Sequence, residues 1–392
     1  MKHIIYILPK ADYFTKGMRG SVSHAIGVAT GFAKTGSRVT VISGPDPDGL
    51  LRGAHPNIEY YAIDFESSGL FGGARWMKRM FARADDLINK AQEDTVVLIR
   101  YGISNGLEIA RFMDQYTPLV WGFEVNSFST HYNTWKIRLF RWVIRKNERL
   151  SFQKARFLYV ISSRLRDDLS FYGIPQGKVV VCPNAGPDPL SDMVCESRDQ
   201  TKVRFAYLGV FQRYYDLPNL VRSFYQMSAE FHETAELHMF GDGEQFQQCR
   251  SEASESSNIF FHGRYELSHL LSEHKIDRQT ILILPLSERF NASFVSPIKL
   301  FEYMAMGLPI LASSTGQIPE ILKHRETAYL YKPGSTESLK NGLQWMMDNP
   351  QERRIMAEKV KAEYADNHTW QTRMAGFMKE IKDRFFTNLS SE

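Results

Sequence analysis

Residues 4–43, IIYILPKADYFTKGMRGSVSHAIGVATGFAKTGSRVTVIS, predict a strand, a loop, a helix and a second strand. The strands are the apolar run Ile4–Leu8 and the segment Arg38–Ser43. Between them, four apolar residues recur at the spacing of one helix face: Val22, Ile26, Ala29 and Ala33. Gly36 is expected to end this helix. Two apolar strands joined by a helix are typical of parallel pairing, so the segment predicts a parallel sheet covered on both faces.

The same pattern continues along the chain. Short runs rich in β-branched and aromatic residues, separated by stretches of helical length, lie at 95–101, 118–125, 157–162, 178–182, 203–209, 236–241, 258–263, 280–286, 308–314 and 328–332. Turn residues at 184–189 and the polar run 191–202 interrupt it, so we place the linker there. We therefore predict an α/β protein with two Rossmann-like domains, 1–190 and 191–372, facing each other across a cleft.

The composition excludes several classes of protein. The chain has 392 residues, 43% of them hydrophobic and 23% charged, which argues against a disordered or collagen-like protein. Its longest apolar runs fall far short of the ~20 residues that span a bilayer, and the N-terminus does not look like a signal peptide. A net charge of +4 does not by itself imply nucleic-acid binding. Three widely spaced cysteines fit a reduced compartment, so we expect a cytoplasmic protein without a structural zinc site.

One helix start suggests an anion site. In residues 293–307, SFVSPIKLFEYMAMG, we expect Ser296 as the N-cap, Pro297 at the first helical position and Gly307 as the left-handed residue after the helix. Lys299 then lies in the first turn, where the helix dipole disfavours a cation. A lysine at this position is favoured if an anion lies just beyond the helix start, bound by free backbone N–H groups and the ammonium together.

Glu302 follows in the same helix among apolar neighbours. A carboxylate in such surroundings is costly unless it is paired or hydrogen-bonded, for example by a ligand hydroxyl. The alternative is that Lys299 and Glu302 form an ordinary surface pair of spacing i,i+3. The sequence leaves both interpretations open.

At these residues the sequence resembles the donor-site signature of family-4 retaining glycosyltransferases, which have the GT-B fold. The matching residues are Ser296, Pro297, Lys299, Glu302–Ala305, Gly307 and Pro309. Other segments resemble family motifs in family order: Gly17-x-x-Gly20 before a helix bearing His24, Pro183–Ala185, Phe240–Gly243, Phe261–Gly263, Thr315–Glu320 and Thr369-Trp370. The resemblance covers nearly the whole chain. It also implies that a C-terminal helix, taken as 373–392, crosses back to the first domain.

The resemblance implies transfer of a hexose-type sugar from a nucleotide-sugar to an acceptor hydroxyl, with retention at the anomeric carbon and without a metal. Glu302 would bind the ribose hydroxyls of the nucleotide. The full set of nucleotide-binding residues implied is Gly17, Gly20, Gly209, Gly241, Gly263, Arg264, Ser296 and Glu302. For Gly17 and Gly20 an ordinary strand-to-helix turn is the alternative.

The sequence departs from the family pattern at three places. These are Phe294 where the first acid is usual, Val210 and Tyr215 where Arg and Lys are common, and Asn126 where many members have a histidine. We hypothesise that Lys299 and Arg213 supply the missing positive charge. The catalytic residues we predict are Lys299, Arg213, Asn126 and His24, although a lone helical histidine such as His24 is often structural.

Two basic segments rich in aromatic residues provide a clue to where the acceptor is found. They are Trp135–Arg149 (WKIRLFRWVIRKNER) and Arg75–Phe81 (RWMKRMF). Such helices suit an anionic membrane surface, but their apolar side chains could equally pack on the sheet. On the membrane interpretation, the acceptor is a saccharide or lipid-linked sugar at the cytoplasmic leaflet, in cell-surface polysaccharide or glycolipid synthesis.

Two other functions are weighed against glycosyl transfer. A nicotinamide-dependent oxidoreductase would need G-x-G-x-x-G directly after the first strand, whereas Gly17 comes late and Ser43-Gly44 ends the second strand without an acid. A catalytically inactive sugar-nucleotide-binding protein of the same fold would bind nucleotide without transferring sugar.

Overall fold

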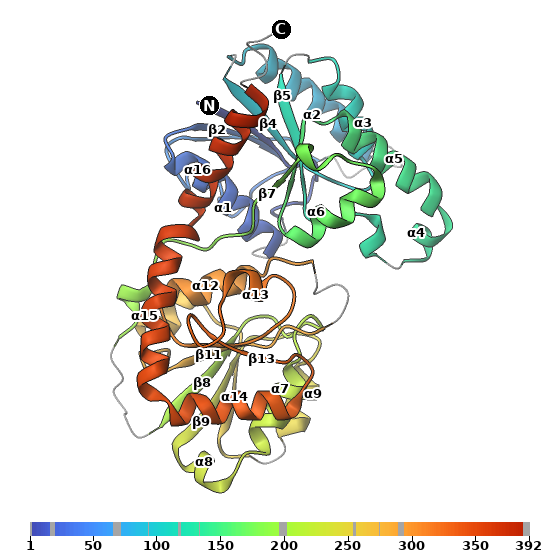
Figure 1. The fold of residues 1–392 in the computed structure, drawn as a ribbon. Helices are drawn as coiled ribbons and strands as arrows, with labels where there is room; N and C mark the ends of the chain where they lie inside the picture. The colour runs from blue at the N-terminus through green and yellow to red at the C-terminus, as the bar shows by residue number, and fades with distance from the viewer. Residues whose placement is uncertain are drawn as a thin grey trace. The chain divides into compact units, whose positions relative to one another are not determined.

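The computed structural model describes residues 2–15, 20–65, 72–92, 94–116, 119–132, 134–195, 202–253, 256–273, 275–288 and 294–386. The chain divides into two compact units (Figure 1). Unit 1 comprises Met1–Ala185 and Trp370–Glu392, and unit 2 comprises Gly186–Thr369. The division thus falls slightly before the predicted boundary at Leu190, and the C-terminal segment from Trp370 onward is part of unit 1.

Unit 1 is built on a parallel sheet of seven strands in the order β3-β2-β1-β4-β5-β6-β7. The strands are β1 (His3–Ile7), β2 (Arg38–Ser43), β3 (Ile58–Ala62), β4 (Thr95–Arg100), β5 (Val120–Val125), β6 (Phe157–Val160) and β7 (Val179–Val181). In the register, Ile4 lies opposite both Val39 and Val96. The strand β3 was not predicted; it lies at the edge of the sheet and most of its side chains are only half-buried.

The helices of unit 1 are α1 (Gly20–Lys34), α2 (Gly72–Asn89), α3 (Gly106–Met113), α4 (Trp135–Leu139), α5 (Arg141–Lys154), α6 (Ser163–Leu169) and α16 (Trp370–Ile381), which continues as a π-helical turn, Lys382–Phe386. Helices α1 and α16 lie side by side (Figure 1). This packing needs a glycine, because a Cβ at Gly27 would lie 2.0 Å from the Trp370 ring. The C-terminal helix is therefore an integral layer of unit 1.

Unit 2 contains a second parallel sheet, in the order β10-β9-β8-β11-β12-β13. Its strands are β8 (Val203–Leu208), β9 (Ala235–Phe240), β10 (Ile259–Gly263), β11 (Ile281–Leu284), β12 (Ile310–Ser313) and β13 (Tyr329–Tyr331). Each lies within two residues or so of a predicted strand. The expectation of two parallel, Rossmann-like sheets is thus confirmed.

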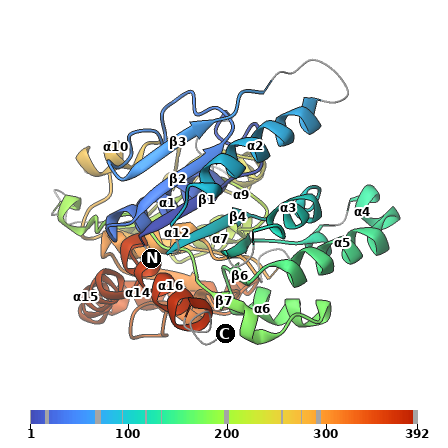
Figure 2. The same cartoon turned by 90° about the horizontal axis from the view of Figure 1, so that it is seen from above.

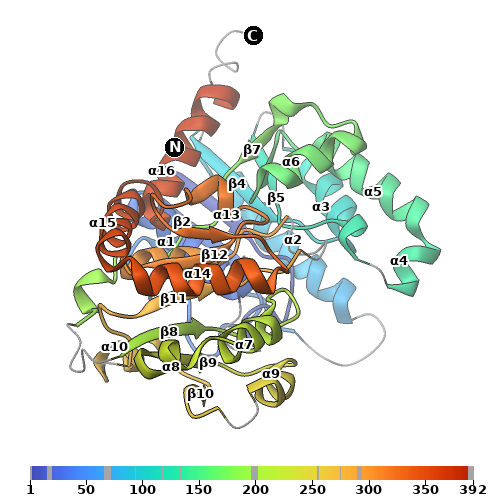
Figure 3. The ribbon, with the colours of Figure 1, turned by 60° about the horizontal axis from the view of Figure 1, so that its bottom comes forward.

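Helices cover both faces of this sheet: α7 (Leu217–Tyr225), α8 (Ala229–Thr234), α9 (Phe246–Ala253), α10 (Leu267–Ser272), α12 (Ile298–Met306), α13 (Ile318–Ile321), α14 (Thr336–Asp348) and α15 (Pro350–Asn367). Alternate residues of β8 point to opposite faces, as a strand requires. Phe205 and Tyr207 pack in the core formed with α7 and α14, whereas Ala206 and Leu208 pack in the core formed with α12. Figure 3 shows α14 lying along the first of these faces.

Three smaller expectations can be compared directly with the structure. The prediction that Ser296 is the N-cap of α12 is wrong, because the helix begins at Ile298 and Pro297 holds the N-cap position. All three cysteines are free. Among the helices that the structure describes, none is both long and apolar enough to cross a membrane.

Candidate functional site

Three predicted glycines lie in a row at the carboxyl ends of neighbouring strands in unit 2. Gly209 follows β8, Gly241 follows β9 and Gly263 ends β10. The backbone N–H of Gly209 donates to the Phe240 carbonyl at 2.9 Å, and that of Gly241 donates to the Gly263 carbonyl at 2.6 Å. In open parallel sheets this edge is where ligands bind.

Two of these glycines are required by space as well as by backbone conformation. A Cβ at Gly209, where φ is +150°, would lie 1.8 Å from Lys299 Nζ. A Cβ at Gly241, where φ is +128°, would lie 1.8 Å from the Gly209 carbonyl oxygen. The strand ends therefore approach one another, and approach Lys299, more closely than any side chain would permit.

Lys299 lies in the first turn of α12 with a half-buried side chain. Its ammonium donates to the carbonyl of Leu208, at the end of β8, and lies 5.5 Å from the centre of the Tyr207 ring and 5.8 Å from that of Tyr215. Burial lowers the pKa of Lys299, an effect that the Glu302 carboxylate partly offsets. Among the residues that the structure describes, no carboxylate forms an ion pair with this cation.

Glu302 follows one turn later and is also half-buried. The interpretation of Lys299 and Glu302 as an i,i+3 ion pair is wrong, because the ammonium bonds to the Leu208 carbonyl instead. Together with burial, the Glu302 charge raises the pKa values of Tyr215 and Tyr265. One short helix thus carries a cation and an anion that do not neutralise each other.

Local contacts fix the position of α12. The hydroxyl of Tyr303 accepts a hydrogen bond from the Leu208 N–H at 2.8 Å, which ties the helix to the end of β8. Gly307 ends the helix in the left-handed conformation, with φ of 62°, as predicted. Before the helix, Ser296 is buried, and so is Phe294, the apolar residue that stands where an acid is usual.

The two predicted arginines lie in exposed positions. Arg213 is 71% exposed, and its Nε lies 3.2 Å from a Glu244 carboxylate oxygen. Arg264 is also exposed, with its Nε 3.7 Å from Asp242. The Arg213 side chain thus forms an ion pair with Glu244. The catalytic role of Arg213 remains a prediction.

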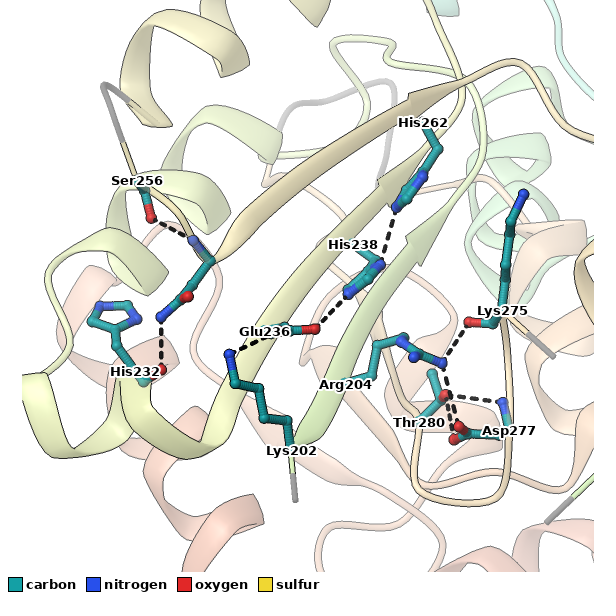
Figure 4. A network of polar contacts seen from close by, with 11 residues as sticks. Lys202, Arg204, His232, Glu236, His238, Ser256, His262, Lys275, Asp277 and Thr280 are labelled. Carbon is teal, nitrogen blue, oxygen red and sulfur yellow. Dashed lines mark hydrogen bonds and ion pairs between the residues drawn. The ribbon is translucent and has the colours of Figure 1, made fainter. Parts of the chain in front are cut away.

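The predicted motif Phe261–Gly263 contains His262, which belongs to a row of polar side chains that runs from β10 across β9 to Lys202, just before β8 (Figure 4). His262 Nε2 lies 3.0 Å from His238 Nδ1, and His238 Nε2 lies 3.2 Å from the Glu236 carboxylate. Glu236 in turn accepts from Lys202 at 2.9 Å. Burial lowers the pKa of His238 to about 4 and also lowers that of His262, so both rings are neutral at pH 7.

In unit 1, two predicted catalytic residues meet at an acid that the sequence analysis missed. Glu124, in β5, is fully buried. His24 Nε2 lies 2.7 Å from its carboxylate, and Asn126 Nδ2 donates to the same oxygen at 2.8 Å. The Asn126 amide oxygen is buried without a hydrogen-bond partner within the described part of the chain. The signal for this centre was an acid within the otherwise apolar strand VWGFEV.

The Glu124 carboxylate is further compensated by Arg100, which forms an ion pair with it, and by the Tyr6 hydroxyl, which donates at 2.5 Å. Burial alone would favour the neutral acid, but Arg100 and His24 outweigh it and lower the pKa of Glu124 to about 2. His24 also contacts Asn184 through Nδ1 at 2.5 Å. Both imidazole nitrogens of His24 therefore face side-chain oxygens.

The N-terminal glycine motif is only partly described. Gly17 lies outside the described residues. Gly20 is the first residue of α1 and is exposed, and a Cβ there would meet nothing within 4 Å. Packing within unit 1 therefore does not explain a glycine at this position.

The arrangement in unit 2 has the chemistry to bind an anion next to a diol. An ammonium flanked by glycines can approach phosphate oxygens, and a carboxylate can accept from two hydroxyls. No group of three or more metal-ligating side chains that could hold an ion occurs among the residues the structure describes.

Comparisons with known proteins agree with this architecture. Residues 18–185 match the model of Glycosyltransferase Family 4, and residues 194–363 match that of Glycosyl transferases group 1. The N-acetyl-alpha-D-glucosaminyl L-malate synthase of Bacillus anthracis is 24% identical over 187 residues, which cover 44% of this chain and 46% of that protein. The match thus spans less than half of the length of this curated relative.

Solved structures match over nearly the full length of the chain. Sucrose-phosphate synthase from Thermosynechococcus elongatus superposes with a TM-score of 0.73 at 13% identity, covering 98% of this chain and 100% of that one. Anabaena HepE in complex with UDP gives a TM-score of 0.68 at 13% identity, with coverage of 98% and 100%. The lipopolysaccharide outer core galactosyltransferase WaaB gives 0.67 at 14% identity, with 98% and 99%. With both halves matched by family models and the fold shared throughout, the chain belongs to the group 1, family-4 glycosyltransferases of GT-B fold.

Proposed function

We propose that the protein transfers a hexose-type sugar from a nucleoside-diphosphate sugar to a hydroxyl of a saccharide or lipid-linked acceptor, with retention of anomeric configuration. The reaction breaks the bond between the anomeric carbon and the diphosphate oxygen and forms a bond from that carbon to the acceptor oxygen. The acceptor's proton balances the charge of the released diphosphate. We expect this activity in the cytoplasm, in polysaccharide or glycolipid synthesis, and without a metal.

One observation carries the proposal: Lys299 and Glu302 lie on one short helix, half-buried and unpaired with each other. Charged groups removed from water are costly unless something compensates them. A nucleoside diphosphate supplies an anion for the ammonium and ribose hydroxyls for the carboxylate. Structures of the similar Anabaena HepE hold UDP and UDP-glucose, which supports a nucleotide-sugar donor.

The proposed catalysis is mainly electrostatic. As the donor bond breaks, negative charge grows on the leaving diphosphate, and a positioned cation with nearby N–H dipoles stabilises that charge. Lys299 supplies the cation, and its bond to Leu208 fixes the ammonium before the donor arrives. The low local polarity that lowers the pKa of Lys299 also strengthens its attraction to phosphate.

The test is a thermal-shift panel with UDP, GDP and ADP, followed by hydrolysis and transfer assays with the matching nucleotide-sugars. We expect Glu302→Gln to weaken nucleotide binding and Lys299→Ala to depress turnover strongly. The matched controls are Lys323→Ala and Glu326→Gln, which alter an i,i+3 pair of the same residue types that is exposed and 3.7 Å apart.

The outcomes separate the alternatives. Wild-type kinetics in both site variants would refute the assignment of Lys299 and Glu302. Nucleotide binding by the wild type without hydrolysis or transfer of any donor would instead favour a catalytically inactive sugar-nucleotide-binding protein.

A further inference from the structure

Helix α4 and the first half of α5 present large apolar side chains to solvent. Trp135 is 68% exposed, Leu139 is 68% exposed and Trp142 is 74% exposed. Phe140 and Val143 are exposed as well. Figure 2 shows these helices at the outer rim of unit 1, away from its sheet. Several large apolar side chains exposed along one short segment, two of them tryptophans, indicate a binding surface.

The second basic segment singled out in the sequence behaves differently. In α2, Trp76, Met77 and Met80 are buried, and Trp76 Nε1 donates to the Ile63 carbonyl at 2.8 Å. The apolar face of α2 is therefore part of the core, as expected if its apolar side chains pack on the sheet. The two segments look alike in composition, so only burial distinguishes them.

The exposed charges of residues 135–149 on α4 and α5 are of one sign. Arg138, Arg141, Arg145 and Lys146 are exposed, and no carboxylate pairs with them in the part of the chain that the structure describes. The one acid of residues 135–149, Glu148, is buried.

The Glu148 carboxylate is held by hydrogen bonds inside unit 1. It accepts from the Ser129 N–H at 2.7 Å, from the Ser129 hydroxyl at 2.5 Å and from the Tyr172 hydroxyl at 2.8 Å. Of the four exposed cations, Arg145 interacts electrostatically with this carboxylate, so Glu148 offsets the positive charge of the exposed face only in part.

We propose that residues 135–149, on α4 and α5, dock the protein on an anionic lipid surface. Tryptophan suits the headgroup region of a bilayer because its ring is apolar and its N–H is polar. Arginine and lysine beside it attract anionic headgroups. A second copy of the chain fits less well, because a symmetric contact would bring the four cations of one copy against the same four of the other. The inference goes beyond the proposed donor chemistry and would hold even if the protein bound nucleotide without transferring sugar.

The experiment is sedimentation of the full chain with vesicles of phosphatidylcholine alone, or of phosphatidylcholine and phosphatidylglycerol at a ratio of about 7:3. Two variants remove the two contributions separately: Arg138→Gln/Arg141→Gln/Arg145→Gln/Lys146→Gln for charge, and Leu139→Ser/Trp142→Ser for apolar contact. The matched control, on exposed positions of α15, is Arg354→Gln/Ile355→Ser/Lys359→Gln. Thermal unfolding of each variant shows that the fold is intact, which is expected because the changed side chains are exposed.

We expect the wild type and the control to bind the anionic vesicles and not the neutral ones, with binding that weakens as salt rises. Each removed charge should reduce the partition coefficient by roughly fivefold at low ionic strength. The apolar variant should bind less at every salt concentration. Three results would overturn the proposal: no binding to anionic vesicles, equal binding of wild type and both variants, or a lipid-independent dimer that the apolar variant abolishes.

Discussion

Replacing Gly209 by alanine tests the geometry of the candidate site most directly, because the new methyl group collides with one identified atom. The added Cβ would lie 1.8 Å from Lys299 Nζ and 2.4 Å from its Cε. Ordinary contact begins near 3.4 Å. The ammonium must therefore retreat by about 1.5 Å, which breaks its bond to the Leu208 carbonyl.

The expected magnitude follows from this displacement. If the ammonium is ~4 Å from a phosphate charge in the wild type and ~5.5 Å away in Gly209→Ala, the attraction weakens by about 1 kcal/mol at an effective dielectric constant near 20. That is roughly a fivefold to tenfold rise in Kd for the nucleotide. The positive φ of Gly209 adds a separate cost of about 1–2 kcal/mol to folding.

Isothermal titration calorimetry with the nucleotide that gives the largest thermal shift measures the affinity, and chemical denaturation measures the stability. Lys299→Ala alone should raise Kd by about three orders of magnitude, because at ~4 Å and an effective dielectric constant near 20 it removes an attraction of about 4 kcal/mol. In the double variant, Gly209→Ala should add less than about twofold, because there is no ammonium left to displace. The loss of stability due to φ should remain in both backgrounds.

The reasoning is refuted if Gly209→Ala leaves Kd unchanged. It is also refuted if Gly209→Ala raises Kd by the same factor with and without Lys299, because the methyl group would then act on something other than the ammonium.

Three further predictions concern stability. His238 has a pKa of about 4 in the folded protein and 6.5 in the unfolded chain. The free energy of unfolding should therefore be highest above pH 6.5 and should fall by about 3 kcal/mol as the pH drops to 4. In His238→Gln, the midpoint of chemical denaturation should depend less on pH across that window. Glu124 has a pKa of about 2 in the folded protein, lowered from its ordinary value of 4.5. Its contribution of about 3 kcal/mol to the free energy of unfolding is therefore present above pH 4.5 and is lost as the pH falls towards 2. Urea unfolding of Glu124→Gln should show lower stability at pH 7 and no such loss at low pH. Gly27→Ala would place a methyl group 2.0 Å from the Trp370 ring and should lower the Tm by several degrees, whereas Gly36→Ala, with nothing within 4 Å, should cost only its backbone strain.

The sequence predicted well what depends on local pattern. The strand Arg38–Ser43 was predicted at its observed bounds, and the left-handed Gly307 was expected at the end of α12. A strand is indicated by its own apolar run, and the end of a helix by the glycine that follows it, so both can be predicted from a few adjacent residues. The half-buried edge strand β3 lacks such a run, and it was missed for that reason.

Long-range pairing could not be predicted in the same way. Glu124 and His24 are a hundred residues apart in the chain and meet only because β5 and α1 lie in one layered unit. Similarly, the sequence allowed Lys299 to pair with Glu302, and the structure shows that it bonds to a carbonyl on β8 instead. A side chain's partner depends on which strand ends are neighbours, which is a property of sheet order.

The two charged centres differ in a way that bears on function. In unit 1, the charge of the buried Glu124 is compensated within the protein, by ion pairs with Arg100 and His24 and hydrogen bonds from Tyr6 and Asn126. This charge therefore stabilises the fold and needs no ligand. In unit 2, Lys299 is tied only to a neutral carbonyl and two aromatic rings among the residues described. Such incomplete compensation costs stability, and proteins retain it where activity requires it. This contrast supports the proposal that an anionic substrate binds beside Lys299, at the edge of the unit 2 sheet.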